Sequence, residues 1–136
     1  MASIFSRIIA GEIPGEFIFR GERWVALLDI RPTNPGHALL VPIAEHAHLC
    51  ELPAATTAEL GQYLTRLVAA VKRVSGCPAL NVVLNDGPIA GQEVPHVHFH
   101  IVPRWPEDGA GYRFKPHPGA ELAPVAEQLR AAWNAA

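Results

Sequence analysis

The sequence predicts an α+β fold: a five-stranded, mainly antiparallel sheet with two longer helices and a short N-terminal helix. Five short segments rich in apolar residues are bounded by Gly, Pro, Asn or Asp, as β-strands usually are. Two longer segments instead carry apolar residues at the spacing of one helix face. The strands do not alternate strictly with helices, which favours an antiparallel sheet. The 136 residues have the length of one domain, so we expect residues 1–136 to form a single domain.

The N-terminal part of the chain is predicted to contain a short helix and three strands. Residues 4–9 (IFSRII) form the helix, and the glycine and proline residues from Gly11 to Pro14 end it. The second strand is almost entirely apolar, so we expect it to be covered on both faces. The three strands are residues 16–21 (EFIFRG), 24–30 (WVALLDI) and 37–42 (HALLVP), with a turn at 31–36 (RPTNPG).

The clearest element is a helix from about Ala58 to Val74, which ends where Gly76 and Pro78 follow. Thr56 and Glu59 resemble a capping box at its start. Its predicted buried face consists of Leu60, Leu64, Leu67, Val68, Val71 and Val74.

The C-terminal part is predicted to hold two more strands and a last helix. The fourth strand is residues 80–85 (LNVVLN), and the fifth runs from His96 to Val102. Prolines and glycines predict irregular surface structure from Pro103 to Pro118. A helix from about Glu121 to Trp133 then flanks the sheet with an apolar face, which consists of Leu122, Val125, Ala126, Leu129 and Trp133.

The composition is that of a globular protein and excludes some partners. The net charge is −2 and charged residues make up 18%, so the chain has no basic excess for a nucleic acid backbone. We expect neither a targeting segment at the N-terminus nor a membrane span. Cys50 and Cys77 form no CxxC motif, and we interpret them as reduced thiols of a cytoplasmic protein.

Three histidines occupy alternate positions of the predicted fifth strand. Because strand side chains alternate between faces, His96, His98 and His100 should project to one side, and the apolar residues between them to the other. One explanation is an exposed polar face. A second is a zinc site, for which the preceding loop offers Asn85, Asp86 and Glu93 as additional ligands.

The third explanation is phosphate chemistry. The loop before the histidines (DGPIAGQEVP) contains Gly87 and Gly91, which let backbone amides approach an anion, and Asn85 adds a side-chain donor. A neutral imidazole beside such donors suits nucleophilic attack on phosphorus. This combination predicts phosphoryl or nucleotidyl transfer better than it predicts a metal site.

Residues 81–104 (NVVLNDGPIAGQEVPHVHFHIVPR) resemble the histidine triad family, whose signature alternates three histidines with apolar residues, as from His96 to Val102. Residues 4–14 (IFSRIIAGEIP) and 25–42 (VALLDIRPTNPGHALLVP) are similar to other parts of that family in the same order. The resemblance implies a nucleotide hydrolase or transferase that needs no cofactor, and commonly a homodimer.

By this resemblance His98 is the nucleophile that attacks the α-phosphorus of a purine nucleotide conjugate. His96 and His100 then bind phosphate or orient their neighbours. The resemblance implies phosphate contacts from Asn85 and from the amides of Gly91, Gln92, Glu93 and Val94. It also implies a nucleoside site formed by Phe5, Ile8, Leu27, Asp29 and Ile30.

Several of these residues have simpler explanations from the sequence alone. Phe5, Ile8, Leu27 and Ile30 are common core residues, and Asp29 could organise the turn that follows it. His37 stands where the family also keeps a histidine near the site.

Two departures from the family pattern affect what we expect for a structural zinc site and for the substrate. Many bacterial members begin with CxFC, half of a zinc site, whereas this chain has Ser3 and Ser6, so we expect no structural zinc. His46 and His48 follow the third strand in an uncertain register for that site. Glu93 stands where serine or threonine is common, and a desolvated carboxyl there could protonate a leaving group.

The sequence therefore predicts cleavage at the α-phosphate through a nucleotidyl-histidine intermediate. An acid at Glu93 favours nucleoside phosphoramidates, because a leaving nitrogen needs a proton, over dinucleoside polyphosphates. A nucleotide-binding module with little turnover and a zinc-dependent protein are the competing hypotheses. The base and the physiological leaving group are not determined by the sequence.

Overall fold

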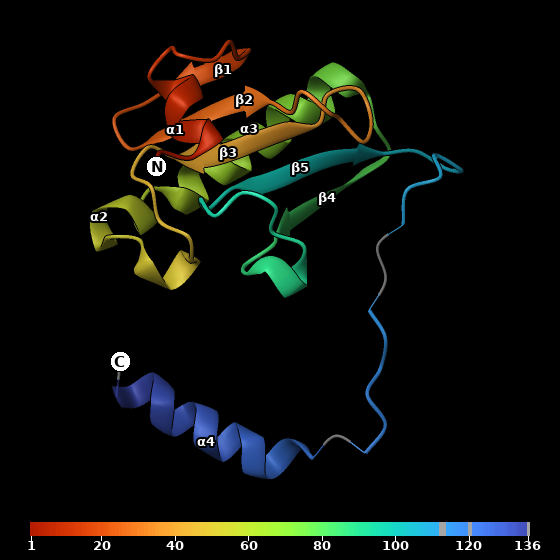
Figure 1. The fold of residues 1–136 in the computed structure, drawn as a ribbon. Coiled ribbons are helices and arrows are strands. Elements are labelled where there is room, and N and C mark those ends of the chain that lie inside the picture. The colour runs from red at the N-terminus through yellow and green to blue at the C-terminus, as the bar shows by residue number, and fades with distance from the viewer. Residues whose placement is uncertain (112–113, 120, 136) are drawn as a thin grey trace.

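The computed structural model describes residues 1–111, 114–119 and 121–135. Its five strands form one sheet in the order β1-β2-β3-β5-β4, and every neighbouring pair is antiparallel, which confirms the predicted class (Figure 1). The strands are β1 (Phe17–Arg20), β2 (Trp24–Leu28), β3 (Ala38–Pro42), β4 (Ala79–Leu84) and β5 (Phe99–Arg104). The helices are α1 (Ile4–Ile9), α2 (Ala54–Thr57), α3 (Leu60–Ser75) and α4 (Leu122–Ala135), with 3-10 turns at Leu49–Glu51 and Pro88–Ala90.

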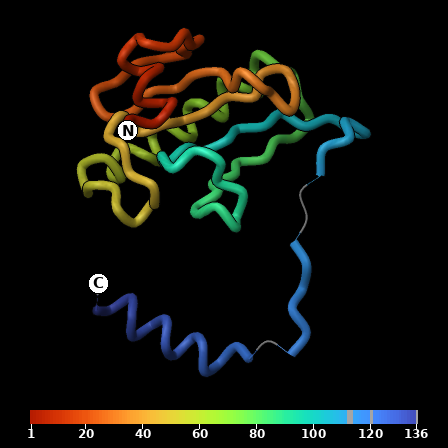
Figure 2. Tube along the Cα trace, in the orientation of Figure 1, coloured from red at the N-terminus to blue at the C-terminus, as the bar shows by residue number. Residues whose placement is uncertain are grey.

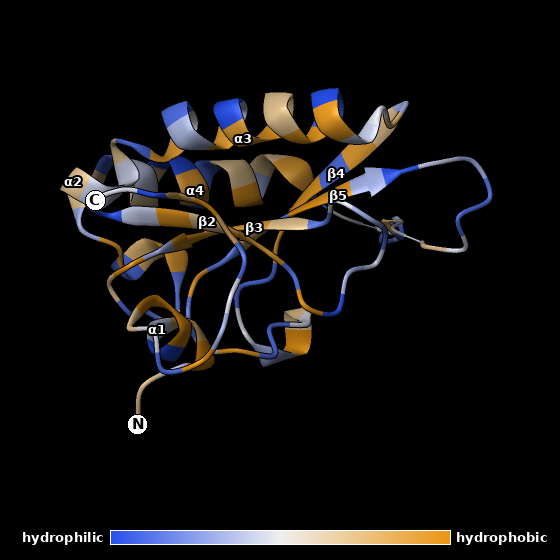
Figure 3. Cartoon of the chain, turned by 90° about the horizontal axis from the view of Figure 1, so that it is seen from above, coloured by the Kyte–Doolittle hydropathy of each residue, from blue (hydrophilic) through white to orange (hydrophobic). Residues whose placement is uncertain are grey.

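The two central strands are covered on both faces, as the apolar second strand predicts. Alternate residues of β2 and β3 pack against α3 on one side, with Trp24 and Leu40 in that cluster. Their neighbours Val25 and Leu39 pack against α1 on the other side. The chain thus has three layers, with the sheet between α3 and α1, and α3 turns its hydrophobic side toward the sheet (Figure 3).

The long helix begins later than predicted, whereas its C-terminal end agrees with the prediction. It begins at Leu60, because residues 54–57 form the separate helix α2 and the predicted capping box does not form. Thr56 is buried instead, and its carbonyl accepts a hydrogen bond from the Trp24 indole (2.9 Å). Gly76 ends the helix in the left-handed conformation (φ 67°), as predicted, but Val74 is exposed rather than buried.

The fifth strand begins at Phe99, so the prediction that it begins at His96 is wrong. The pairing with β3 stops at Leu40 opposite Phe99. Beyond this point Pro42 lacks an amide hydrogen, and its carbonyl lies 2.7 Å from His96 Nε2. The Val97 amide instead donates to the His46 carbonyl (2.8 Å).

The last helix does not flank the sheet, which corrects the prediction for its apolar face. Helix α4 lies apart from the other elements, after the segment that follows β5 (Figures 1 and 2). The reason is that α3 and α1 already cover the two faces of the sheet. Its large apolar side chains are all exposed, namely Leu122, Val125, Leu129 and Trp133.

The irregular segment begins at Trp105 rather than at Pro103, which still belongs to β5. Residues 112–113 of this predicted segment lie outside the described residues. In the part of the chain that the structure describes, no helix is long and apolar enough to span a bilayer.

Candidate functional site

A cavity of about 440 Å³ lies on the α1 side of the sheet. It is bounded by α1, by the segment that follows β2, by β3, by the loop after β4 and by the start of β5. Most of the predicted site residues line it: Phe5, Ile8, Leu27, Asp29, Ile30, Asn85, Gly91, Glu93, Val94, His98 and His100. The fold thus brings together residues from five separate parts of the chain.

His98 is held in one tautomer by its own backbone. Its Nδ1 lies 2.7 Å from the His96 carbonyl oxygen, which can only accept, so Nδ1 carries the proton. The other ring nitrogen, Nε2, is then left with a free lone pair. The ring is buried and contacts Phe5 of α1, with 4.8 Å between the ring centroids. His98 therefore has the protonation pattern of a nucleophile.

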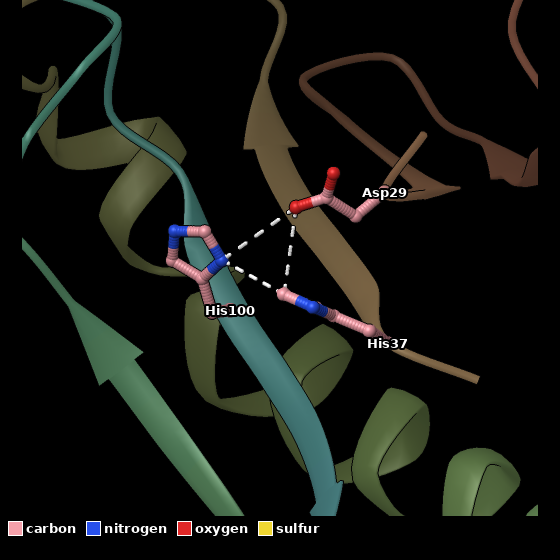
Figure 4. Close-up of side chains that lie close together, drawn as sticks. All are labelled: Asp29, His37 and His100. Atoms are coloured by element: carbon pink, nitrogen blue, oxygen red, sulfur yellow. Dashed lines mark hydrogen bonds and ion pairs between the residues drawn. The ribbon is translucent and has the colours of Figure 1, made fainter. Parts of the chain in front are cut away.

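His100 belongs to a hydrogen-bonded chain with His37 (Figure 4). The Thr33 amide donates to His37 Nδ1 (3.0 Å), so the proton of neutral His37 is on Nε2. That nitrogen lies 2.9 Å from His100 Nδ1 and donates to it. The proton of His100 is consequently on Nε2, which leaves this atom as the hydrogen-bond donor of the ring.

Burial favours the neutral form of His100 and His37. It lowers the pKa of His100 to about 4, with further lowering from the neighbouring His98 and His37 and an opposing effect of Asp29. Burial also lowers the pKa of His37, against the attraction of the Asp29 carboxylate. Asp29 Oδ2 lies 3.5 Å from His37 Nε2 and 4.0 Å from His100 Nδ1. Its Oδ1 accepts a hydrogen bond from the Arg31 amide. Asp29 therefore also organises the turn that follows it, which was its simpler explanation from the sequence.

His96 lies behind the cavity rather than in its wall. The imidazole is fully buried, and its Nε2 donates to the Pro42 carbonyl (2.7 Å). Its Nδ1 therefore accepts from the Ser3 hydroxyl (2.6 Å), and burial lowers its pKa. His96 orients its surroundings instead of facing the cavity.

The two serines that replace the CxFC thiols take part in a polar network. Ser3 caps α1 by accepting from the Ser6 amide (3.0 Å), and the Ser6 hydroxyl donates to Glu45 (2.7 Å). The Ser3 amide donates to the same carboxylate oxygen, and these bonds lower the pKa of Glu45 to about 2. The network ties α1 to the segment after β3 and to His96. The absence of a structural zinc stays a prediction.

The loop after β4 is preorganised by its glycines. Gly87 and Gly91 have φ of 100° and 99°, which favour glycine, and a Cβ at Gly91 would crowd the Asn85 side chain. The amide of Gly91 donates to the Pro88 carbonyl, however, and that of Gln92 to Gly87. These two amides already donate within the loop, and their contact with phosphate stays a prediction.

The amides of Glu93 and Val94 are the remaining candidates for phosphate. Within the described part of the chain neither amide donates to a protein acceptor, and both residues line the cavity. Asn85 lines it as well, with its side-chain amide 3.4 Å from the Gly91 carbonyl.

Gln92 does not line the cavity. Its side chain instead holds the loop by hydrogen bonds on the side away from the cavity. Its side chain is buried, donates to the Ala47 carbonyl (2.8 Å) and accepts from the Gly87 amide (2.8 Å). Beside it, Asp86 accepts from the Leu49 amide (3.2 Å) and pairs with His48 (2.5 Å). This pairing raises the pKa of His48, mainly through the hydrogen bond to Asp86. His48 therefore helps to hold this loop in place through Asp86.

Glu93 is not desolvated, so the premise that burial would keep it protonated is wrong. The exposed fraction of its side chain is 82%, and its carboxylate lies 3.5 Å from the exposed Arg31 guanidinium. Both residues line the mouth of the cavity.

The apolar residues of the predicted nucleoside site are both core and cavity wall. Phe5, Ile8 and Leu27 belong to the hydrophobic cluster under α1 and also line the cavity, whereas Ile30 is exposed at its edge. The lining residues that the sequence analysis missed are Ile4, Gly15, Leu28, Arg31, Thr33 and Leu39. The turn residues Arg31 and Thr33 could have been inferred from their proximity to Asp29.

Comparison with known proteins identifies the family of this chain. Residues 10–107 match the profile of the HIT domain. An uncharacterised HIT-like protein of Methanocaldococcus jannaschii is 37% identical, over 93% of this chain and 98% of the relative. The adenosine 5′-monophosphoramidase of Schizosaccharomyces pombe is 36% identical, over 95% and 96% of the two chains.

The structure also superimposes on a crystal structure of a HIT family member from Bacillus subtilis, with a TM-score of 0.87 and 28% identity. This match covers 98% of this chain and 96% of the other. The agreement of sequence and fold over nearly the whole length shows that the chain belongs to the HIT (histidine triad) family.

Proposed function

We propose that the protein hydrolyses or transfers nucleotides by cleaving at the α-phosphate of a nucleotide conjugate, through a nucleotidyl-His98 intermediate. The observation that carries the proposal is the hydrogen bond from His98 Nδ1 to the His96 carbonyl, which leaves Nε2 unprotonated in a residue that lines the cavity. A general nucleotide hydrolase activity agrees with the phosphoramidase among the relatives.

In the first step, His98 Nε2 forms a bond to the α-phosphorus, and the bond to the leaving group breaks with its electron pair. The leaving nitrogen takes up a proton from solvent. The imidazole becomes positively charged, and the His96 carbonyl stabilises it through the Nδ1 hydrogen bond. Water then attacks the phosphorus, loses a proton to solvent and breaks the bond between phosphorus and His98, which releases a nucleoside monophosphate and restores neutral His98.

The nonbridging phosphate oxygens need donors during both steps. His100 Nε2 is such a donor, since its Nδ1 accepts from His37. The free amides of Glu93 and Val94 and the side chain of Asn85 add three more on the opposite loop. No metal is required to neutralise the phosphate in this scheme.

The nucleoside is proposed to occupy the cavity between α1 and the segment after β2. A volume of about 440 Å³ is within the common range for small-molecule sites. Phe5, Ile8, Leu27 and Ile30 provide the apolar walls that a purine base needs, and Asp29 provides an acceptor for the ribose hydroxyls.

Nucleoside phosphoramidates are the proposed substrate class, and dinucleoside polyphosphates are the alternative. The relative from Schizosaccharomyces pombe, named an adenosine 5′-monophosphoramidase, supports the first class. Glu93 supports phosphoramidates less than the sequence suggested, because its carboxylate is exposed and paired with Arg31.

We further propose that the chain acts as one domain in a homodimer in the cytoplasm. The exposed apolar face of α4 supports a second copy as its partner, because such a face is unfavourable in water. The free thiols of Cys50 and Cys77 agree with a reducing compartment.

The decisive experiment replaces the nucleophile. His98→Gln should abolish turnover of adenosine phosphoramidate and of diadenosine polyphosphate, and should leave the affinity for AMP within about threefold of wild type, because the phosphate donors remain. Mass spectrometry of wild type quenched during turnover should show an AMP adduct that the variant lacks. Equal turnover by the variant would overturn the mechanism. Affinity without turnover in wild type would favour the binding-module hypothesis.

A further inference from the structure

Three side chains converge at one edge of the cavity in the arrangement of metal ligands (Figure 4). Asp29 follows β2, His37 precedes β3, and His100 lies on β5. Among the described residues this is the group of His, Cys, Asp or Glu whose ligand atoms all lie within 4.8 Å of one another. Each contributes one such atom: Asp29 Oδ2, His37 Nε2 and His100 Nδ1.

The separations between these atoms match the size of a zinc ion. His37 Nε2 lies 2.9 Å from His100 Nδ1 and 3.5 Å from Asp29 Oδ2, and the third separation is 4.0 Å. A point equidistant from the three atoms is therefore about 2 Å from each, which is the bonding distance of zinc to nitrogen and carboxylate oxygen. Two imidazoles and one carboxylate favour zinc over magnesium or calcium, which prefer oxygen ligands.

We propose that Asp29, His37 and His100 form a reversible zinc site, whose fourth coordination position opens to the cavity. All three residues line the cavity, so the fourth ligand is water or a bound anion. The site is distinct from the network around Ser3, Ser6 and His96, where serines and a fully buried histidine are already engaged with one another.

Zinc binding at this site has a structural cost. In the metal-free protein the Thr33 amide donates to His37 Nδ1, which keeps the proton on Nε2. To bind zinc, His37 must move this proton to Nδ1 and give up the bond from Thr33, whose amide belongs to an exposed turn. The exchange weakens the site, so we expect micromolar rather than tighter affinity, and metal that dialysis against a chelator removes.

Occupancy by zinc should inhibit the proposed reaction, and this consequence alone rests on the proposed function. Zinc takes the Asp29 carboxylate that the ribose is proposed to use. Zinc and nucleotide should therefore compete.

The test is a titration of the chelator-treated full chain with zinc by calorimetry, and with cobalt by visible absorption. We expect one ion per chain and the intense absorption bands of four- or five-coordinate cobalt. His37→Gln and Asp29→Asn should each weaken the affinity by about tenfold or more, since each removes one ligand. Asp29 is partly exposed, so its variant tests the site even where His37→Gln fails to fold.

Two control variants separate this site from other histidines. His48→Gln removes the other close histidine–carboxylate pair, His48 with Asp86, and should leave the affinity unchanged. His98→Gln should also bind zinc normally while lacking turnover, so the zinc site and the nucleophile are tested separately. Affinity weaker than about 100 µM in wild type would overturn the proposal. Binding that survives both ligand variants, or is lost in His48→Gln, would do the same.

Discussion

At the scale of single residues, backbone groups decide which imidazole nitrogen carries a proton. The His96 carbonyl selects the tautomer of His98, and the Thr33 amide selects that of His37. The tautomer of His37 in turn sets that of His100. Side chains with the same intrinsic chemistry therefore differ in which ring nitrogen can donate and which can accept a hydrogen bond.

The buried His100 should make the protein less stable in acid. Its pKa in the folded state is lowered to about 4 from the ordinary 6.5, so below pH 6.5 the unfolded chain binds more protons and the free energy of unfolding falls. The contribution is fully present above pH 6.5 and is lost as the pH falls toward 4, by about 3 kcal/mol in total. Urea unfolding at several pH values should show that the free energy of unfolding falls less steeply with decreasing pH in His100→Asn than in wild type.

The control for this measurement is His48→Gln. The pKa of His48 is raised, so its contribution is present at low pH and is lost as the pH rises. Removing it should not flatten the acid dependence. An unchanged pH dependence in His100→Asn would contradict the prediction that burial dominates at this residue.

Glu93 is predicted to influence the leaving group through charge rather than as a buried acid. The pair with Arg31 is exposed, so it is weak and opens readily. Glu93→Gln should reduce phosphoramidate turnover by less than about threefold, because no desolvated proton donor is lost. It should raise kcat/KM for the more anionic dinucleoside polyphosphates by a similar factor, because Arg31 is then unpaired. A loss of most phosphoramidate turnover alone would restore the acid hypothesis.

At the scale of elements, the conformation of the loop between β4 and β5 depends on hydrogen bonds from the segment after β3. Gln92 joins Ala47 to Gly87, and Asp86 pairs with His48 on the same side. The free amides of Glu93 and Val94 follow Gln92 directly. The position of these proposed phosphate donors is therefore set by contacts outside the cavity.

Gln92→Ala should weaken phosphate binding without affecting the nucleoside. The substitution leaves the Gly87 amide and the Ala47 carbonyl without their partner, which costs about 1–3 kcal/mol of stability. AMP affinity should fall by about tenfold while adenosine affinity stays unchanged, which calorimetry at a temperature well below unfolding can measure.

Gln62→Ala, at an exposed glutamine of α3, is the matched control and should change neither affinity. Equal losses for AMP and adenosine in Gln92→Ala would indicate general destabilisation instead of a specific effect on the loop.

At the scale of the whole molecule, α4 carries an apolar face that the other described elements do not cover. Leu122, Val125, Leu129 and Trp133 are at least 49% exposed. The remaining elements form three layers that are complete without α4. A second copy of the chain is the partner that we propose for this face.

Leu129→Glu should shift the proposed homodimer to monomer. Because Leu129 is 64% exposed in the single chain, the charge costs little within one copy but is unfavourable in an interface. Sedimentation at about ten micromolar should give a dimer for wild type and a monomer for the variant, with unchanged circular dichroism. Gln128→Glu, which adds a charge at an exposed neighbouring position of α4, should remain dimeric. A monomeric wild type would contradict the homodimer.

The class of the fold and the order of the strands along the chain could be predicted from the sequence alone. These features follow from local patterns: alternation in the strands, helical spacing in α3 and glycines in the loop. The resemblance to the family added the residues expected at the nucleoside site and the proposed role of His98. Eleven of the thirteen predicted site residues line the cavity, with Gln92 and His96 behind it.

The partner of each polar group depends on the tertiary structure. The pairing of His37 with His100, the brace through Gln92 and the exposure of Glu93 join residues that are distant in the sequence or depend on the surrounding solvent. The position of α4 likewise depended on which sheet faces were already covered. A local pattern reports the periodicity of one segment, whereas burial and hydrogen bonding depend on which segments meet, and this is decided only when the chain is folded.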